Sequence, residues 1–131
     1  MHTSPDVTLE SFHRFVHSLP AVTEDFPFGP EVLVLRVSGK IFALMSVDAL
    51  PLKVNLKCDP ERAVELRAEY DGVIPGWHMN KKHWNTVALG DDVPGPLLKE
   101  LIVHSWHLVV AGMPKKAQEP LFSALEPEYL S

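Results

Sequence analysis

The clearest prediction of the fold of this chain comes from residues 32–58, VLVLRVSGKIFALMSVDALPLKVNLKC. Two apolar runs rich in branched side chains, Val32–Val37 and Ile41–Val47, are separated only by Ser38-Gly39-Lys40 and predict a β-hairpin. The run over residues 52–58 alternates with a period of two, so it predicts a strand with one apolar and one polar face. Its inward residues are Leu52, Val54, Leu56 and Cys58, and its outward residues are Lys53, Asn55 and Lys57. Parallel sheets are usually covered on both faces. A sheet with one solvent-exposed face therefore favours an antiparallel meander.

Helical patterns flank these strands. Apolar residues within Thr8–Leu19 recur at three- and four-residue steps and predict a helix, whereas the prolines of Glu24–Pro30 predict a loop. Asp59-Pro60 supplies an N-cap and a first-turn proline for a second helix. A broad apolar face over Leu97–Val110 predicts a third helix. For Glu119–Ser131 we expect no more than a small turn of helix or a frayed end.

Two further strands complete the predicted sheet. They are Val73–Met79 and His83–Leu89, joined by the tight polar link Asn80-Lys81-Lys82. The element order is then α-β-β-β-α-β-β-α. This order predicts an α+β two-layer sandwich in which the helices cover one face of an antiparallel sheet.

Length and composition exclude several classes of protein. A chain of 131 residues has the size of one domain, so we assign residues 1–131 to a single domain. The apolar content of 46% and the charged content of 22% are typical of globular domains and exclude a disordered, collagen-like or coiled-coil chain. The net charge of −5 creates no global attraction to nucleic acid or to an anionic membrane, so any site for a polyanion must be a local patch.

Cysteine usage and the N-terminal residues predict a compartment. Cys58 is the single cysteine, which excludes an intramolecular disulfide. The first residues lack the basic start and the apolar run of a signal peptide, and no apolar run is long enough to span a membrane. We therefore expect a cytoplasmic protein without a membrane partner.

Histidine is the first candidate for chemistry, because it is both a near-neutral acid–base group and a common metal ligand. His13 and His17 are four residues apart on the first predicted helix, and His104 and His107 are three apart on the third. The first pair has neither a cysteine nor the glutamate signature of a metalloprotease beside it. Solvation and packing explain them more simply, so we expect no metal and no cofactor.

A catalytic site is not predicted either. The inward phase of Cys58 indicates a small buried hydrophobe instead of a nucleophile. The chain has no glycine-rich phosphate loop and no G-x-S-x-G motif. We expect a protein that is not an enzyme; an enzyme using His78, His83 or Cys58 would need a pocket in which two of these side chains converge.

The most unusual segment is Pro75–Val87, PGWHMNKKHWNTV, in which two tryptophans flank a basic tip. Lysines supply charge for phosphates, asparagines hydrogen-bond to bases or backbone, and an indole stacks on an unpaired base. Spacing alone favours a simpler interpretation, in which Trp77 and Trp84 are core partners across two strands and the lysines keep a turn hydrated.

Several blocks, in the same order along the chain, resemble the MmcQ/YjbR-like family of small bacterial domains. They are Gly39–Leu44, Leu56–Glu61, Asp71–Gly76, His78–Trp84, His104–Trp106 with Leu108–Ala111, and Pro114–Lys116. The resemblance covers residues 8–116 and leaves 117–131 as a tail. It implies a compact α+β fold similar to secretion-chaperone-like or frataxin-like domains, and it implies DNA contact through a double wing.

Our leading expectation is a DNA-binding protein that contacts phosphates through the tip. The expected contacts are Asn80, Lys81, Lys82, His83, Lys115 and Lys116. The alternative is a protein-interaction module, chaperone-like or homodimeric, that uses the wet sheet face or an apolar groove. A dispersed set of lysines beside an open apolar strip would favour the alternative.

Overall fold

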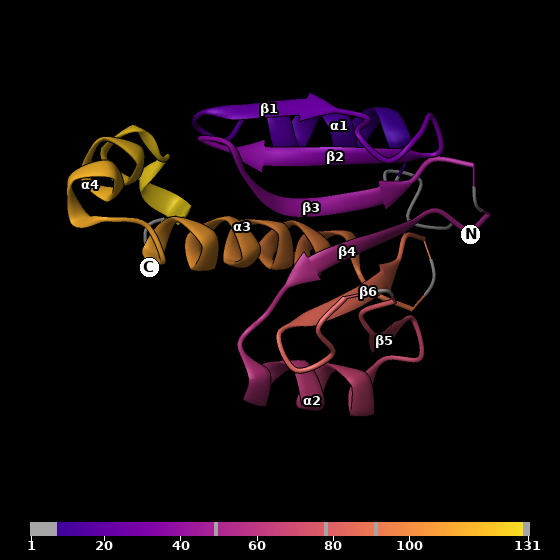
Figure 1. Ribbon diagram of the computed structural model, residues 1–131. Coiled ribbons are helices and arrows are strands. Elements are labelled where there is room, and N and C mark those ends of the chain that lie inside the picture. The colour runs from indigo at the N-terminus through magenta and orange to yellow at the C-terminus, as the bar shows by residue number, and fades with distance from the viewer. Residues whose placement is uncertain (1–7, 49, 78, 91, 130–131) are drawn as a thin grey trace.

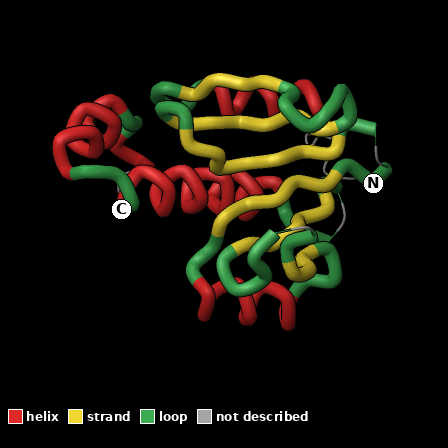
Figure 2. The backbone as a smooth tube through the Cα atoms, viewed as in Figure 1, coloured by secondary structure: helices red, strands yellow, loops and turns green. Residues whose placement is uncertain are grey.

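The computed structural model describes residues 8–48, 50–77, 79–90 and 92–129, and its strands form one antiparallel sheet (Figure 1 and Figure 2). Along the chain the elements are α1 (Leu9–His17), β1 (Val22–Asp25), β2 (Val32–Val37), β3 (Lys40–Ser46), β4 (Lys53–Lys57), α2 (Pro60–Glu69), β5 (Val73–Pro75), β6 (Trp84–Ala88), α3 (Gly95–Ala111), α4 (Lys115–Ala124) and a 3-10 turn (Pro127–Tyr129). The strand order in the six-stranded sheet is β1-β2-β3-β4-β6-β5, and every neighbouring pair is antiparallel. The predicted α+β class is confirmed.

Helices α1, α2 and α3 cover one face of this sheet, and the opposite face is open toward the viewer in Figure 1. A single apolar core joins Phe12 of α1, Leu66 of α2 and Ile102 of α3 to the inward strand residues Leu35 and Leu56. The longest helix, α3, contacts β2, β3 and β4 and therefore anchors the middle of the sheet. The predicted two-layer arrangement, with helices on one face, is confirmed.

Local sequence signals set the starts of α1 and α2, and the start of α2 is as predicted. The Asp59 carboxylate accepts a hydrogen bond from the Arg62 amide at 3.2 Å, and Pro60 opens α2. Thr8 and Ser11 cap α1 reciprocally. On α3, Trp106 is fully buried and its indole donates to the Pro20 carbonyl at 3.1 Å, which ties the end of α1 to the core.

Strand β1 was not predicted. Its residues Val22–Asp25 pair with β2, so that Glu24 stands opposite Leu35 and Asp25 opposite Val34. Only Val22 is partly buried, because β1 is an edge strand that packs few side chains. An edge strand with so little burial has no apolar alternation, and the prediction of a loop at Glu24 and Asp25 was therefore wrong.

The connection between the last two strands also differs from the prediction. Strand β5 ends at Pro75, and β6 begins at Trp84, so residues 76–83 form a loop in place of a tight turn over Asn80-Lys81-Lys82. Gly76 still donates its amide to the Trp84 carbonyl at 2.9 Å, and beyond this bond the chain leaves β6. The basic segment is consequently a folded loop and not the tip of a long hairpin.

The tail contains a helix of ten residues, α4, where a short turn or a frayed end was expected. Pro120 lies inside this helix, and a proline in a helix interior argues against a continuous helix in the sequence. Packing overrides that signal, since Leu121 and Leu125 are buried and the Phe122 ring meets Trp106 edge-on at 5.8 Å between centroids. Within the described residues, no helix combines the length and apolar character needed to cross a bilayer.

Candidate functional site

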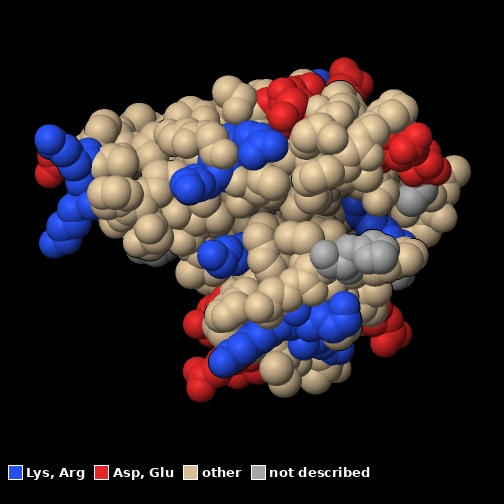
Figure 3. Space-filling view, viewed as in Figure 1, with Lys and Arg blue, Asp and Glu red and all other residues tan. Residues whose placement is uncertain are grey.

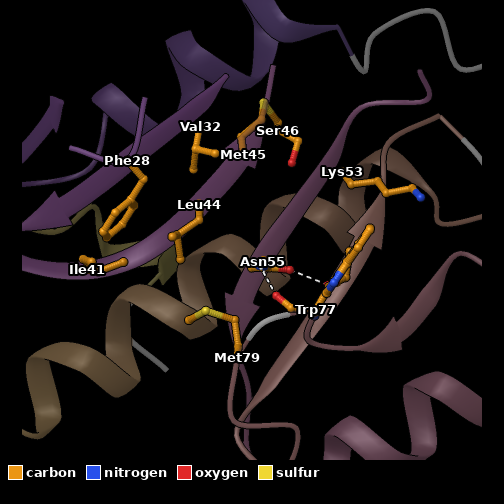
Figure 4. A pocket seen from close by; sticks show the side chains of 11 residues that line it. Phe28, Val32, Ile41, Leu44, Met45, Ser46, Lys53, Asn55, Trp77 and Met79 are labelled. Atoms are coloured by element: carbon orange, nitrogen blue, oxygen red, sulfur yellow. Dashed lines mark hydrogen bonds between the residues drawn. The ribbon is translucent and has the colours of Figure 1, made fainter. Parts of the chain in front are cut away.

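The open face of the sheet carries a groove with a volume of about 570 Å³ (Figure 4). Its floor comes from β2, β3, β4 and β6, and its sides come from the loop before β2 and the loop after β5. The lining side chains belong to Phe28, Val32, Ile41, Leu44, Met45, Ser46, Lys53, Asn55, Trp77, Met79 and Thr86. A mostly apolar concavity of this size with a few polar groups is typical of a binding site.

Two large aromatic side chains are exposed at this groove. Phe28 follows Pro27 in the loop between β1 and β2 and is 63% exposed, and Trp77 in the loop after β5 is 59% exposed. Both rings therefore keep apolar surface in contact with water, and folding gains no hydrophobic free energy from that surface. Such area, gathered beside a groove, marks an interaction site.

A ring of hydrogen bonds holds the Trp77 segment against the sheet. The Trp77 amide donates to the Thr86 hydroxyl at 2.9 Å, and the Asn55 amide group donates to the Trp77 carbonyl at 3.2 Å. The Thr86 hydroxyl in turn donates to the Asn55 side-chain oxygen, and the two residues stand opposite each other on β4 and β6. The polar groups of Asn55 and Thr86 therefore hold the tryptophan backbone in place.

One lysine lines the groove, and three others lie outside its lining. Lys53 lines it, and Lys57 shares its face of β4 because successive side chains of a strand alternate between faces. Lys81 and Lys82 are exposed in the loop after β5. None of the four forms an ion pair with a carboxylate among the described residues. Figure 3 shows cationic side chains spread over this face and acidic ones mainly at its margins.

Arg67 of α2 folds the basic loop back against the body. Its guanidinium donates to the carbonyl oxygens of Lys81 and Trp84 and, at 2.7 Å, to the side-chain oxygen of Asn85. The Lys81 ammonium donates to the Gly76 carbonyl at 3.1 Å, which closes the loop on itself. These hydrogen bonds hold the loop in place, and of its two lysines Lys81 turns its ammonium to the loop's own backbone.

The other predicted tip residues have structural roles. The Asn80 side chain accepts from the Lys82 amide at 2.9 Å and shapes the turn. The His83 carbonyl accepts from the Cys58 amide at 2.8 Å and joins the loop to the end of β4. On the far side of Lys82, Glu61 and Glu65 of α2 line the same shallow depression and bound the positive surface.

The structure does not bring Lys115 and Lys116 to this surface. They begin α4, which packs on the end of α3 at one extremity of the molecule, whereas the loop after β5 lies beside α2 (Figure 1). The six predicted contacts therefore divide into two separate groups. This dispersion beside a mostly apolar groove is the observation that was expected to favour a protein-interaction module.

The other candidate groups for chemistry have structural roles. Cys58 is 3% exposed, and burial raises the pKa of its thiol. Burial lowers the pKa of His104, whose Nε2 accepts from the Asp59 amide at 3.1 Å. His107 Nε2 lies 2.5 Å from the Tyr129 carbonyl. His78 falls outside the described residues.

Sequence reasoning assigned no role to Phe28 and favoured a core position for Trp77. Phe28 stands in a proline-rich loop where no periodicity reveals its direction, and Trp77 lies just past the end of β5, where strand alternation no longer applies. In contrast, strand alternation correctly predicted that Lys53 and Asn55 face outward, and both residues line the groove.

Comparisons with known proteins agree with this fold. The YjbR family model matches residues 17–108, which include all six strands. The uncharacterized protein YbdF of Escherichia coli O157:H7 is 42% identical over 84% of this chain and 90% of its own length. The uncharacterized protein YjbR of E. coli K12 is 31% identical over 88% and 98%.

Solved structures are similar as well. The crystal structure of Deinococcus radiodurans protein DR2400 superposes with a TM-score of 0.82 at 38% identity, covering 92% of this chain and 91% of that one. A Pseudomonas syringae protein superposes with a TM-score of 0.68 at 27% identity, covering 77% and 97%.

Proposed function

This chain belongs to the YjbR family, and we propose that it is a non-catalytic DNA-binding protein that holds an unpaired strand across the open face of its sheet. The observation that carries the proposal is the combination, at one groove, of two exposed aromatic rings with Lys53, which has no carboxylate partner among the described residues. Lys81 and Lys82 add exposed positive charge in the loop that carries Trp77. Unspecific single-strand binders combine stacking rings with backbone-tracking cations in this way.

The rings supply the sequence-tolerant part of the interaction. Every base has a flat face, and stacking on an aromatic side chain contributes about 1–3 kcal/mol per base. Phe28 and Trp77 stand on the two sides of the groove, so a single strand that crosses it meets both. A paired duplex keeps its bases stacked inside the helix and gains nothing from these rings.

The lysines supply the electrostatic part. Lys53 lines the groove, Lys57 lies on the same face of β4, and Lys81 and Lys82 are exposed in the loop that carries Trp77. Each neutralised phosphate of a single strand adds about −0.7 to the slope of log affinity against log salt. The net charge of −5 opposes association at long range, so we expect weak binding that is best at low salt.

The polar centre of the groove favours this occupant over a partner peptide. An extended peptide would require free hydrogen-bonding groups, but Asn55 and Thr86 direct their hydrogen bonds to each other and to the Trp77 backbone. The groove offers two ring faces, the Lys53 ammonium and an aliphatic floor, and the rings and the ammonium match bases and a phosphate.

Fluorescence anisotropy with a labelled single-stranded oligonucleotide and the matching duplex, at low and moderate salt, tests the proposal. We expect single-strand binding that Trp77→Ala weakens about 5–150-fold, the range that corresponds to one lost stack. The double variant Lys81→Glu with Lys82→Glu should reduce both the affinity and the salt slope. Lys115→Glu with Lys116→Glu, which changes the net charge equally at the far end of the molecule, is the matched control.

Three results would reject the proposal. One is absence of binding at low salt, and another is equal loss in the two double charge reversals, which would indicate only a general charge effect. The third is a dimer in light scattering that Phe28→Asp dissociates, because the groove would then be a protein interface.

A further inference from the structure

A cluster of three ligand-type side chains lies on the helix side of the sheet edge, away from the groove. His13 and His17 belong to α1, and Glu24 belongs to β1. His13 Nε2 is 2.5 Å from Glu24 Oε1, and His17 Nε2 is 2.6 Å from the same oxygen. The three donor atoms all lie within 4.8 Å of one another.

The local structure explains why these atoms converge. Residues four apart on a helix project from the same side, and the two imidazole rings stand 4.5 Å apart between centroids. Strand β1 runs beside α1, and alternation turns Glu24 toward the helix while Asp25 turns to the open face, where it pairs with Arg36. Two separate elements thus aim three side chains at one point.

Two imidazole nitrogens and a carboxylate oxygen form a donor set that suits first-row transition metals. Zinc takes such ligands at about 2.0–2.2 Å in tetrahedral geometry, and three-ligand sites leave one position for water. The hard cations Mg²⁺ and Ca²⁺ prefer all-oxygen sites. All three residues are exposed, so the carboxylate withdraws slightly without breaking packing, and an ion takes the central position.

We propose that His13, His17 and Glu24 form a binding site for a divalent transition-metal ion such as Zn²⁺. The ion takes the place of the two N–H···O hydrogen bonds and cross-links α1 to the edge strand. Metal occupancy therefore stabilises the N-terminal part of the fold by mass action, because the unfolded chain does not hold the three ligands together.

Titration of the untagged, chelator-treated protein tests this site. Isothermal calorimetry with ZnCl2 should give one site per chain, and CoCl2 should produce the visible absorption of a low-coordinate N/O site. Each of His13→Asn, His17→Asn and Glu24→Gln should weaken zinc by more than the roughly 10–100-fold that loss of an outer-shell partner costs. His83→Asn and Glu65→Gln are matched controls that remove an imidazole in the loop after β5 and an exposed carboxylate on α2.

Thermal melting gives an independent measurement. ZnCl2 should raise the melting midpoint of the wild type and of both controls but not of the three ligand variants, whereas MgCl2 should raise none of them. Circular dichroism of each variant verifies that it folds. The proposal is overturned by absence of zinc binding to the wild type, by equal affinity in wild type and ligand variants, or by loss of binding in a control.

Discussion

Ser105→Ala should destabilise the protein far more than its size suggests. Ser105 lies on α3 with 0% exposure, and its hydroxyl donates to the Phe42 carbonyl at 2.6 Å and accepts from the Lys57 amide at 2.9 Å. Pairing of β3 with β4 ends at Ala43 opposite Leu56, so Phe42 and Lys57 would be the next pair. The hydroxyl bridges the two strands at the place where their own ladder opens.

The magnitude follows from what alanine leaves behind. Removal of the hydroxyl leaves one carbonyl and one amide without this hydrogen-bond partner. Each buried group left unsatisfied costs about 1–3 kcal/mol. The two strands can approach each other only in part, because β3 is displaced by the irregularity that faces Leu35 and Arg36. We therefore expect a loss of roughly 2–4 kcal/mol in the free energy of unfolding.

Urea denaturation followed by circular dichroism measures this loss. The control is Ser123→Ala, at an exposed position of α4, for which we expect a change within about 0.5 kcal/mol. The denaturant slope should stay constant, so the whole effect appears in the midpoint. A loss of less than about 1 kcal/mol for Ser105→Ala, at constant slope, would refute the claim that the hydroxyl completes the sheet.

Three further predictions concern the site and the core. Thr86→Val removes a hydroxyl that bonds to the Trp77 amide, so hydrogen exchange at that amide should accelerate and the protein should lose about 1–3 kcal/mol. Gly76→Ala would place a Cβ 2.7 Å from the Trp84 Cβ, and this overpacking should cost about 1–3 kcal/mol. Burial lowers the pKa of His104 below its ordinary 6.5, so the unfolded chain takes up the proton first and stability should fall as pH decreases through that value. In His104→Gln the same pH titration of stability should be shallower.

Each of these predictions has a contrary outcome. Unchanged exchange in Thr86→Val would mean that the ring of hydrogen bonds does not restrain the tryptophan. Gly112→Ala is the control for Gly76→Ala, because its added Cβ would meet no atom closer than 3.5 Å. Equal stability of the two alanine variants would contradict the close contact. Identical pH profiles for wild type and His104→Gln would show that another group controls acid stability.

The periodicity of the sequence was sufficient to predict burial wherever a residue's position in its own strand or helix decides that burial. The alternation of residues 52–58 predicted which side chains of β4 face the core and which face the open side, and Asp59-Pro60 predicted the start of α2. Both signals are local, since they depend on dihedral geometry and on the first turn of a helix. Interactions across the fold left no such trace: the long-range bridge from Ser105 to two strands looks in sequence like one polar residue on an apolar helix face.

The binding groove was predictable only in part for the same reason. Strand alternation located Lys53 and Asn55, but Phe28 and Trp77 reach the groove from loops, whose course depends on contacts with residues far along the chain. Arg67 is the clearest case, because a helix residue determines where the basic loop lies. The charge of that loop was evident from sequence, and its neighbours were not.

The unpredicted strand β1 has the largest consequence for function. With Glu24 in a loop, His13 and His17 are two surface histidines without a third ligand, and a metal site is the weaker interpretation. Pairing of β1 with β2 fixes the direction of every second side chain, and this turns Glu24 toward both imidazoles. A half-exposed edge strand carries almost no hydrophobic signal, yet its position beside α1 decides the coordination chemistry available there. A ligand set divided between a helix and an edge strand is therefore a kind of site that sequence spacing alone undervalues.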